Sequence, residues 1–228
     1  MARLLTLLSG FSLAVLAQAQ TSNLTIVEWR TGNAKVDALI EQLTPAEKIS
    51  LVHGSDDPSG YQQQAGHVVG VPRLGIPGVR LTDGEAGVNV VNNATAVPMQ
   101  LNVAATWSKS AAYQSGYVPG REAKILGMDV LLAPRVNILR DPVNGNFWQS
   151  YSEDPFLNAQ LGVRALTAIQ AQGAMGNPKQ IGPSSTGASN GDRNSIVDMQ
   201  TLRVCTAPAL APAYSAEIAV PAVSPRYS

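Results

Sequence analysis

The stretch that most constrains the fold runs from residue 128 to residue 155. It opens with a short apolar run at residues 130–132, which lies between a glycine and a proline and predicts a buried strand. A long polar loop follows, and then Asp154 and Pro155 form a good helix start, because Asp caps free N–H groups and Pro suits the first helical position. Strand, loop and helix in this order indicate an α/β protein, in which such loops lie where ligands bind.

The loop carries the side chains that a sugar site uses. Hydrogen-bonding groups suit the hydroxyls of a sugar, and an aromatic plate suits the face of its ring. The alternative is a surface loop that its own polar residues solvate, and this stretch alone favours that alternative. The residues concerned are Arg140, Asp141, Asn146, Trp148, Gln149 and Tyr151.

Three blocks of sequence carry a resemblance to a known family. Residues 133–155, APRVNILRDPVNGNFWQSYSEDP, resemble the signature of glycoside hydrolase family three, the β-glucosidase and β-xylosidase family. Residues 81–89, LTDGEAGVN, are similar to the family's D-G-P-x-G-V block, although Glu85 stands where a Pro-containing turn is usual, and Lys179 falls where a Lys-His pair is expected. The likeness covers about residues 36–202.

The resemblance implies a fold and a reaction. The fold is α/β, the N-terminal portion of a (β/α)8 TIM barrel, over a domain at residues 20–202, followed by a disordered or irregular Ala/Pro-rich tail at residues 203–228. The reaction is retaining hydrolysis of terminal non-reducing β-D-glucosyl residues, without a cofactor. The implied partner is a β-glucoside or an oligosaccharide.

The resemblance also implies sugar contacts. Asp83 takes the position of an Asp that accepts hydrogen bonds from glucose hydroxyls, and Lys179 that of a cationic Lys. The family's Arg, Glu and His are Asn146, Gln149 and Gln180, so each loses an ionisable group and keeps an amide. These changes fit either a retuned subgroup or decay of the site. The expected substrate-binding residues are Asp83, Lys179, Arg140, Asn146 and Gln149.

No catalytic residue is assigned in this chain. Retaining glycosidases need two carboxyl groups about 5–5.5 Å apart, a nucleophile and an acid/base. In the family both lie in later segments, and this sequence leaves the family pattern after Leu202. Glu153 and Asp154 are a tempting pair, but neighbours in sequence normally diverge, and Asp154 is better explained as a helix cap.

Three functional alternatives follow. The first is a β-glucosidase-like chain in a truncated form that lacks the nucleophile and the acid/base, since roughly 250 residues make a complete barrel. The second is a non-catalytic carbohydrate-binding remnant. The third is a non-functional secreted fragment whose motif residues only support the fold.

The N-terminus predicts secretion. Residues 1–19 read as a signal peptide, with Arg3 before an apolar run at residues 4–16 and an A-x-A cleavage site at residues 17–19. Sequons at Asn23 and Asn93 predict glycosylation. We therefore expect a secreted, extracellular glycoprotein.

Composition narrows the choice of partner. Lys and Arg number 16, as do Asp and Glu, so no charge excess points to nucleic acid or to an anionic membrane. One Cys and two isolated His do not suggest a metal cluster. We expect no nucleic acid, membrane or metal partner, and the oligomeric state is unknown.

Local patterns predict the elements before the central stretch. Apolar residues at i, i+3, i+4 and i+7 predict a helix over residues 36–43. A capping box at residues 44–47 starts a second helix that ends at Gly54, with His53 in its last turn beside the negative end of the helix dipole. Residues 55–70 are predicted to form a long loop.

Further elements are predicted on either side of that stretch. A strand begins at about Val79, and Asp83 ends it. Ser108 caps a helix that Pro119 interrupts and that resumes over residues 121–126. The remaining predictions are a helix over residues 156–172, a weak strand over 174–181 and a loop over 182–195.

Overall fold

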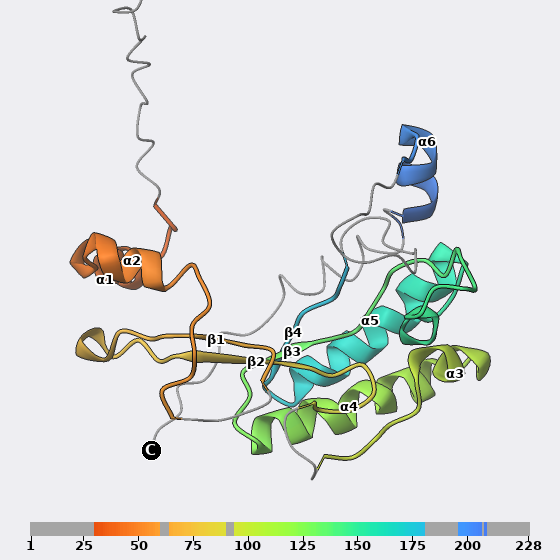
Figure 1. Ribbon diagram of the computed structural model, residues 1–228, viewed down its shortest axis with the longest axis horizontal. Coiled ribbons are helices and arrows are strands. Elements are labelled where there is room, and N and C mark those ends of the chain that lie inside the picture. The colour runs from red at the N-terminus through yellow and green to blue at the C-terminus, as the bar shows by residue number, and fades with distance from the viewer. Residues whose placement is uncertain (1–29, 60–63, 90–93, 181–195, 207, 209–228) are drawn as a thin grey trace, which may run out of the picture. The chain divides into compact units, whose positions relative to one another are not determined.

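The computed structural model describes residues 30–59, 64–89, 94–180, 196–206 and 208 (Figure 1). The chain forms two compact units, residues 1–43 and residues 44–228. The predicted signal peptide, the sequon residues Asn23 and Asn93, the whole loop over 182–195 and most of the Ala/Pro-rich tail lie outside the described residues. In the part of the chain that is described, no helix combines the length and the apolar character that a membrane span needs.

The first unit contains α1 (Ala34–Gln42), which confirms the helix predicted from its apolar spacing. Asn33 caps it, and the side-chain oxygen of Asn33 accepts hydrogen bonds from the backbone N–H groups of Lys35 and Val36. The carboxylate of Asp37 in the first turn accepts from the backbone and hydroxyl of Thr31. These bonds favour the ionised carboxylate and hold the pKa of Asp37 below its ordinary value.

The second unit opens with α2 (Pro45–Ser50), whose predicted capping box is present. Glu47 accepts from the backbone N–H of Thr44 and also forms an ion pair with Arg73, 2.5 Å from its Nη2. The predicted end at Gly54 is wrong. The helix ends at Ser50 because the apolar residues that suggested a longer helix, Ile49 and Val52, are exposed and gain nothing from extending it.

His53 therefore lies beyond α2 and not in its last turn. Its Nδ1 lies 2.8 Å from the carbonyl oxygen of Gly54. A His outside the last turn cannot interact with the helix dipole in the way that the sequence suggested.

A mixed four-stranded sheet forms the centre of the second unit, in the order β1-β2-β3-β4. β1 (Gly66–Val68) pairs antiparallel with β2, whereas β2 (Val79–Asp83), β3 (Val130–Leu132) and β4 (Met175–Gly176) run parallel. The predictions for β2 and β3 are confirmed, and together with the helices the sheet confirms an α/β protein.

Two predictions around this sheet need correction. The expected loop over residues 55–70 contains β1, a three-residue strand whose stability comes from pairing with β2 and not from its own sequence. The expected strand over residues 174–181 shrinks to the two residues of β4, because Pro178 cannot donate a ladder hydrogen bond. Lys179 still joins the sheet through a single parallel bridge to Arg135.

Two helices, α4 (Lys109–Ile125) and α5 (Pro155–Ala171), pack on this sheet, and α3 (Gln100–Ala105) packs against these two helices. Figure 1 shows α4 and α5 side by side along the sheet, and both contact its strands. Ser108 caps α4, and Asp154 caps α5 with both carboxylate oxygens, so both predicted caps are confirmed. The six-residue α3 was not predicted.

The predicted interruption of α4 at Pro119 is wrong, since the helix continues through it. A proline inside a helix costs roughly 3 kcal/mol, so packing must offset this cost. Gly116 and Gly120 provide that packing. A Cβ on Gly116 would lie 2.2 Å from the carbonyl oxygen of Ala165, and one on Gly120 would lie 2.8 Å from the Cα of Ile169. The glycines let the backbones of α4 and α5 approach closely.

The core lies between the sheet and these two helices. Leu131 of β3 and Met128 are fully buried beside Ala123 and Ile169 from α4 and α5. Gly84 completes the contact, since a Cβ there would collide with the side chain of Leu131. This packing fixes the position of the chain directly after β2.

The short elements outside the core are η1 (Pro72–Leu74), η2 (Phe147–Gln149), α6 (Met199–Thr201) and a π-helical turn over Leu202–Thr206.

Candidate active site

A pocket of about 410 Å³ lies at the carboxyl ends of the parallel strands. Asp83 closes β2, Arg135 follows β3 and Lys179 follows β4, so three neighbouring strands each deliver a charged side chain to it. This is the edge at which α/β proteins bind ligands, because the loops there converge on one point. The sequence separates these residues widely, and the parallel pairing brings them together.

Lys179 lies between two carboxylates. Its Nζ is 2.5 Å from Asp83 Oδ1 and 2.7 Å from Glu85 Oε1. The Glu85 side chain is 7% exposed, that of Lys179 22% and that of Asp83 43%. The more buried carboxylate thus anchors the ammonium, and the more exposed one remains available to a ligand.

Arg135 holds the other side of the pocket. Its Nη1 donates to Oε1 of Gln149, and its Nη2 donates to Oε1 of Gln180 at 3.2 Å. Its backbone N–H donates to Oε1 of Gln100 at 3.2 Å, and Gln100 Nε2 in turn donates to the hydroxyl of Tyr151 at 3.1 Å. Arg135 is therefore tied at both ends, to the pocket and to the core.

Tyr151 is part of that support and not of the pocket surface. It is almost completely buried, and burial raises the pKa of its hydroxyl because the charged phenolate would lose its water. A neutral Tyr151 hydroxyl remains able to accept the hydrogen bond from Gln100.

An aromatic side chain completes the pocket. Trp148 lies in η2, and its indole Nε1 donates to the carbonyl oxygen of Gly145 at 3.1 Å. The side chain is exposed although it lines the pocket. A fixed, accessible indole is a surface on which a sugar ring can stack.

The predicted sugar contacts separate into two groups. Asp83, Lys179 and Gln149 line the pocket, together with Gln180. Arg140 and Asn146 are exposed and lie outside its lining. The turn over residues 144–149 explains the position of Asn146, since it turns Trp148 and Gln149 into the pocket.

Two pocket residues were missed as ligand contacts by the sequence analysis, Arg135 and Glu85. Glu85 was noted only as a departure from a Pro-containing turn. Arg135 follows an apolar strand and a proline, a context that is typical of a residue that supports the fold and does not contact a ligand. No local signal identifies a residue whose side chain reaches partners 14 and 45 positions away.

The acidic pair Glu153 and Asp154 lies outside the lining of the pocket. Asp154 uses both carboxylate oxygens on backbone N–H groups of Phe156 and Leu157. Glu153 is exposed, and neither residue lines the pocket. Among the described residues, no cluster of three or more His, Cys, Asp or Glu side chains could hold a metal ion.

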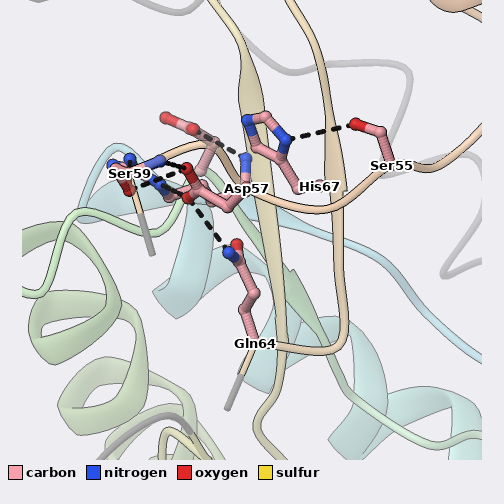
Figure 2. Close-up of polar contacts among 7 residues, drawn as sticks. Ser55, Asp57, Ser59, Gln64 and His67 are labelled. Atoms are coloured by element: carbon pink, nitrogen blue, oxygen red, sulfur yellow. Dashed lines mark hydrogen bonds and ion pairs between the residues drawn. The ribbon is translucent and has the colours of Figure 1, made fainter. Parts of the chain in front are cut away.

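A second polar cluster lies around β1 (Figure 2). The Asp57 carboxylate accepts hydrogen bonds from Arg80, Ser59 and Gln64, and its oxygen is 2.6 Å from Arg80 Nε. The guanidinium is the main reason that the pKa of Asp57 is far below its ordinary value. Figure 2 also shows His67 beside Ser55, with 3.4 Å between Nδ1 and the hydroxyl. These contacts tie the preceding loop to the β1–β2 pair.

Comparison with known proteins finds relatives of this chain. The 35% identity to β-glucosidase A of Aspergillus kawachii covers 67% of this chain and 18% of that protein. The 33% identity to a β-glucosidase of Rhizobium radiobacter covers 74% of this chain and 20% of that protein. Both relatives are β-glucosidases, and the chain spans about a fifth of the length of these curated relatives.

Solved structures agree with the sequence relatives. β-Glucosidase 3B from Thermotoga neapolitana, in complex with glucose, superposes with a TM-score of 0.75 at 31% identity, over 80% of this chain and 28% of that one. DesR, a β-glucosidase from Streptomyces venezuelae in complex with D-glucose, gives 0.73 at 35% identity, over 81% and 24%. Residues 32–219 match the sequence model described as the Glycosyl hydrolase family 3 N terminal domain. The chain belongs to glycosyl hydrolase family 3.

Proposed function

We propose that this chain supplies the glucose-binding part of a retaining β-glucosidase that hydrolyses terminal non-reducing β-D-glucosyl residues. The observation that carries the proposal is an ion pair in the pocket between residues from different strands. Lys179 Nζ lies 2.5 Å from Asp83 Oδ1. A carboxylate and an ammonium side by side offer a strong acceptor and a strong donor to adjacent hydroxyls. The two similar β-glucosidase structures, DesR and β-glucosidase 3B, were solved in complex with glucose.

The surroundings of the ion pair support a neutral polyol. Asp83 and Glu85 balance Lys179 and Arg135, so the four charges that line the pocket sum to zero. Gln149 and Gln180 add amides, which bond hydroxyls without adding charge, and Trp148 adds an aromatic face. We expect a β-glucoside or an oligosaccharide as partner.

If the pocket binds glucose as proposed, the catalytic carboxyl groups must be other than Asp83 and Glu85. A retaining glycosidase needs one carboxylic acid that can donate its proton to the leaving oxygen. Asp83 and Glu85 each form an ion pair with the Lys179 ammonium, so both carboxylates of the pocket already have a partner. We propose that the nucleophile and the acid/base of the parent enzyme come from later segments of a (β/α)8 barrel, of which residues 20–202 form the N-terminal portion.

Secretion belongs to the same proposal. The signal-like residues 1–19 and the sequons at Asn23 and Asn93 favour an extracellular glycoprotein that acts on external glucosides. N-terminal sequencing of protein from the medium should give a start near Gln20. Intracellular protein that retains Met1 would contradict this part of the proposal.

The decisive experiment is a calorimetric titration of the purified chain with glucose, beside an assay with an aryl β-glucoside. We expect saturable glucose binding and no turnover at an enzymatic rate. Absence of saturable binding would instead support a fragment whose motif residues only support the fold. Turnover that stops on changing Glu85 or Asp83 would require a new catalytic assignment.

A further inference from the structure

Two glutamines of the pocket share one cation. The guanidinium of Arg135 donates from Nη1 to Gln149 and from Nη2 to Gln180, and both acceptors are side-chain Oε1 atoms. Gln149 comes from η2, and Gln180 follows the bridge beyond β4. One buried arginine thus joins two segments that reach the pocket from different parts of the chain.

The chemistry of these groups fixes which way each amide is turned. A guanidinium carries only donors, so the amide group facing it must be the oxygen. In a glutamine the NH2 group lies on the other side of the terminal carbon from that oxygen. The Nε2 donors of Gln149 and Gln180 are therefore directed away from Arg135, and both residues line the pocket.

We infer that Arg135 is a positioning residue that makes Gln149 and Gln180 hydrogen-bond donors to the ligand. The inference rests on the proposed function, since it takes a glucosyl unit as the occupant. The pocket then has an acceptor side, formed by Asp83 and Glu85, and a donor side, formed by Lys179 and the two amides. Ligand oxygens that face the amides must act as acceptors, which hydroxyl oxygens can do.

The backbone contacts of Arg135 make this role possible. Its main chain is held by Gln100, which is itself bonded to the buried Tyr151. The guanidinium is consequently fixed before any ligand arrives, and so are the amides. The competing explanation is that Arg135 only stabilises the local structure and that the amide orientation has no effect on the ligand.

Gln149→Glu separates the two explanations, because it acts in opposite directions on stability and on binding. A carboxylate at position 149 gives Arg135 a charge-assisted bond, so the thermal midpoint of unfolding should stay the same or rise. The ligand loses a donor and meets an acceptor instead. We expect glucose affinity to fall roughly tenfold, as when a hydrogen bond is lost and a polar group is left unpaired.

Gln160→Glu is the matched control. Gln160 also accepts a hydrogen bond from a cation, Lys109 Nζ at 2.6 Å, but it lies on the surface of α5 and outside the pocket. Its glucose affinity should equal that of the unchanged protein. Arg135→Lys is the second test variant, because an ammonium cannot hold two oxygens in a fork, and its glucose affinity should also fall.

The measurements are calorimetric titration with glucose and thermal unfolding of the full chain, for each variant. Equal glucose affinity in the unchanged protein and Gln149→Glu would overturn the inference and leave the proposed function intact. A lower thermal midpoint in Gln149→Glu would also overturn it, because the contact with Arg135 would not be the one described. An unchanged protein that shows no saturable binding would overturn the proposed function, and the inference with it.

Discussion

The ammonium of Lys179 lies 2.7 Å from the carboxylate of Glu85, and Glu85 is the least exposed of the three charged side chains in that cluster. This pairing has a clear consequence for the neighbouring Asp83. With Glu85 already compensating the charge of Lys179, Asp83 does not have to act as its sole partner. The carboxylate of Asp83 can therefore also accept hydrogen bonds from a ligand.

The first prediction concerns Glu85. Glu85→Gln removes one charge from a nearly buried ion pair and should destabilise the protein by about 1.5–3 kcal/mol, the range for hydrogen bonds to charged groups. Urea unfolding measures the change. Glu153→Gln is the control, since Glu153 is exposed, and its free energy of unfolding should move by less than about 0.5 kcal/mol. Equal effects of the two substitutions would contradict the anchoring role of Glu85.

The second prediction concerns the sugar contact at Asp83. Asp83→Ala should weaken glucose binding by about 1.5–3 kcal/mol, because a carboxylate accepts charge-assisted hydrogen bonds from hydroxyls. Calorimetric titration gives the affinity. Asp141→Ala serves as the control, because Asp141 lies in the same polar loop as Trp148 but outside the pocket lining. A retained affinity in Asp83→Ala would remove Asp83 from the site.

The third prediction tests the close approach of α4 and α5. Gly116→Ala places a Cβ 2.2 Å from the carbonyl oxygen of Ala165, so the helices must separate. Overpacking of this kind should cost about 1–3 kcal/mol in the free energy of unfolding. Gly145→Ala is the matched control, because nothing lies within 4 Å of a Cβ at Gly145. A neutral Gly116→Ala would mean that the two helices do not need this contact.

The fourth prediction is a pH dependence that comes from Glu47. The hydrogen bond from the Arg73 guanidinium, followed by that from the backbone N–H of Thr44, lowers the pKa of Glu47 from 4.5 to about 2. A carboxyl whose pKa is lower in the folded state stabilises the fold above its unfolded pKa and loses that effect as pH falls through the folded pKa. The contribution should therefore be complete above about pH 4.5 and disappear towards pH 2.

Urea unfolding at a series of pH values between 6 and 2 gives the measurement for Glu47. The unchanged protein should lose more stability across the window below about pH 4.5 than Glu47→Gln does. Added salt should reduce the difference, since Arg73 is half exposed and its pair with Glu47 is screened. Identical pH profiles would show that Glu47 is not linked to folding in this way.

Much of the local structure is determined by the sequence itself. The capping box at residues 44–47, the Asp154-Pro155 start of α5 and the apolar strand β3 are all present as predicted. These features depend on interactions within a few residues, such as a side-chain oxygen that bonds the first free N–H groups of a helix. The motifs that indicated a glycosidase likewise depend only on the order and spacing of residues, and the comparisons confirm the family.

The tertiary structure alone decided the features that join distant segments. Packing against α5 keeps α4 continuous through Pro119, and pairing with β2 makes a strand of Gly66–Val68. In the pocket, parallel pairing of β2, β3 and β4 determines that Lys179 meets Glu85 and that Arg135 reaches two glutamines. The physical reason is the same throughout. Local rules describe a residue and its neighbours in sequence, whereas close packing and charge pairing depend on which strands and helices lie side by side.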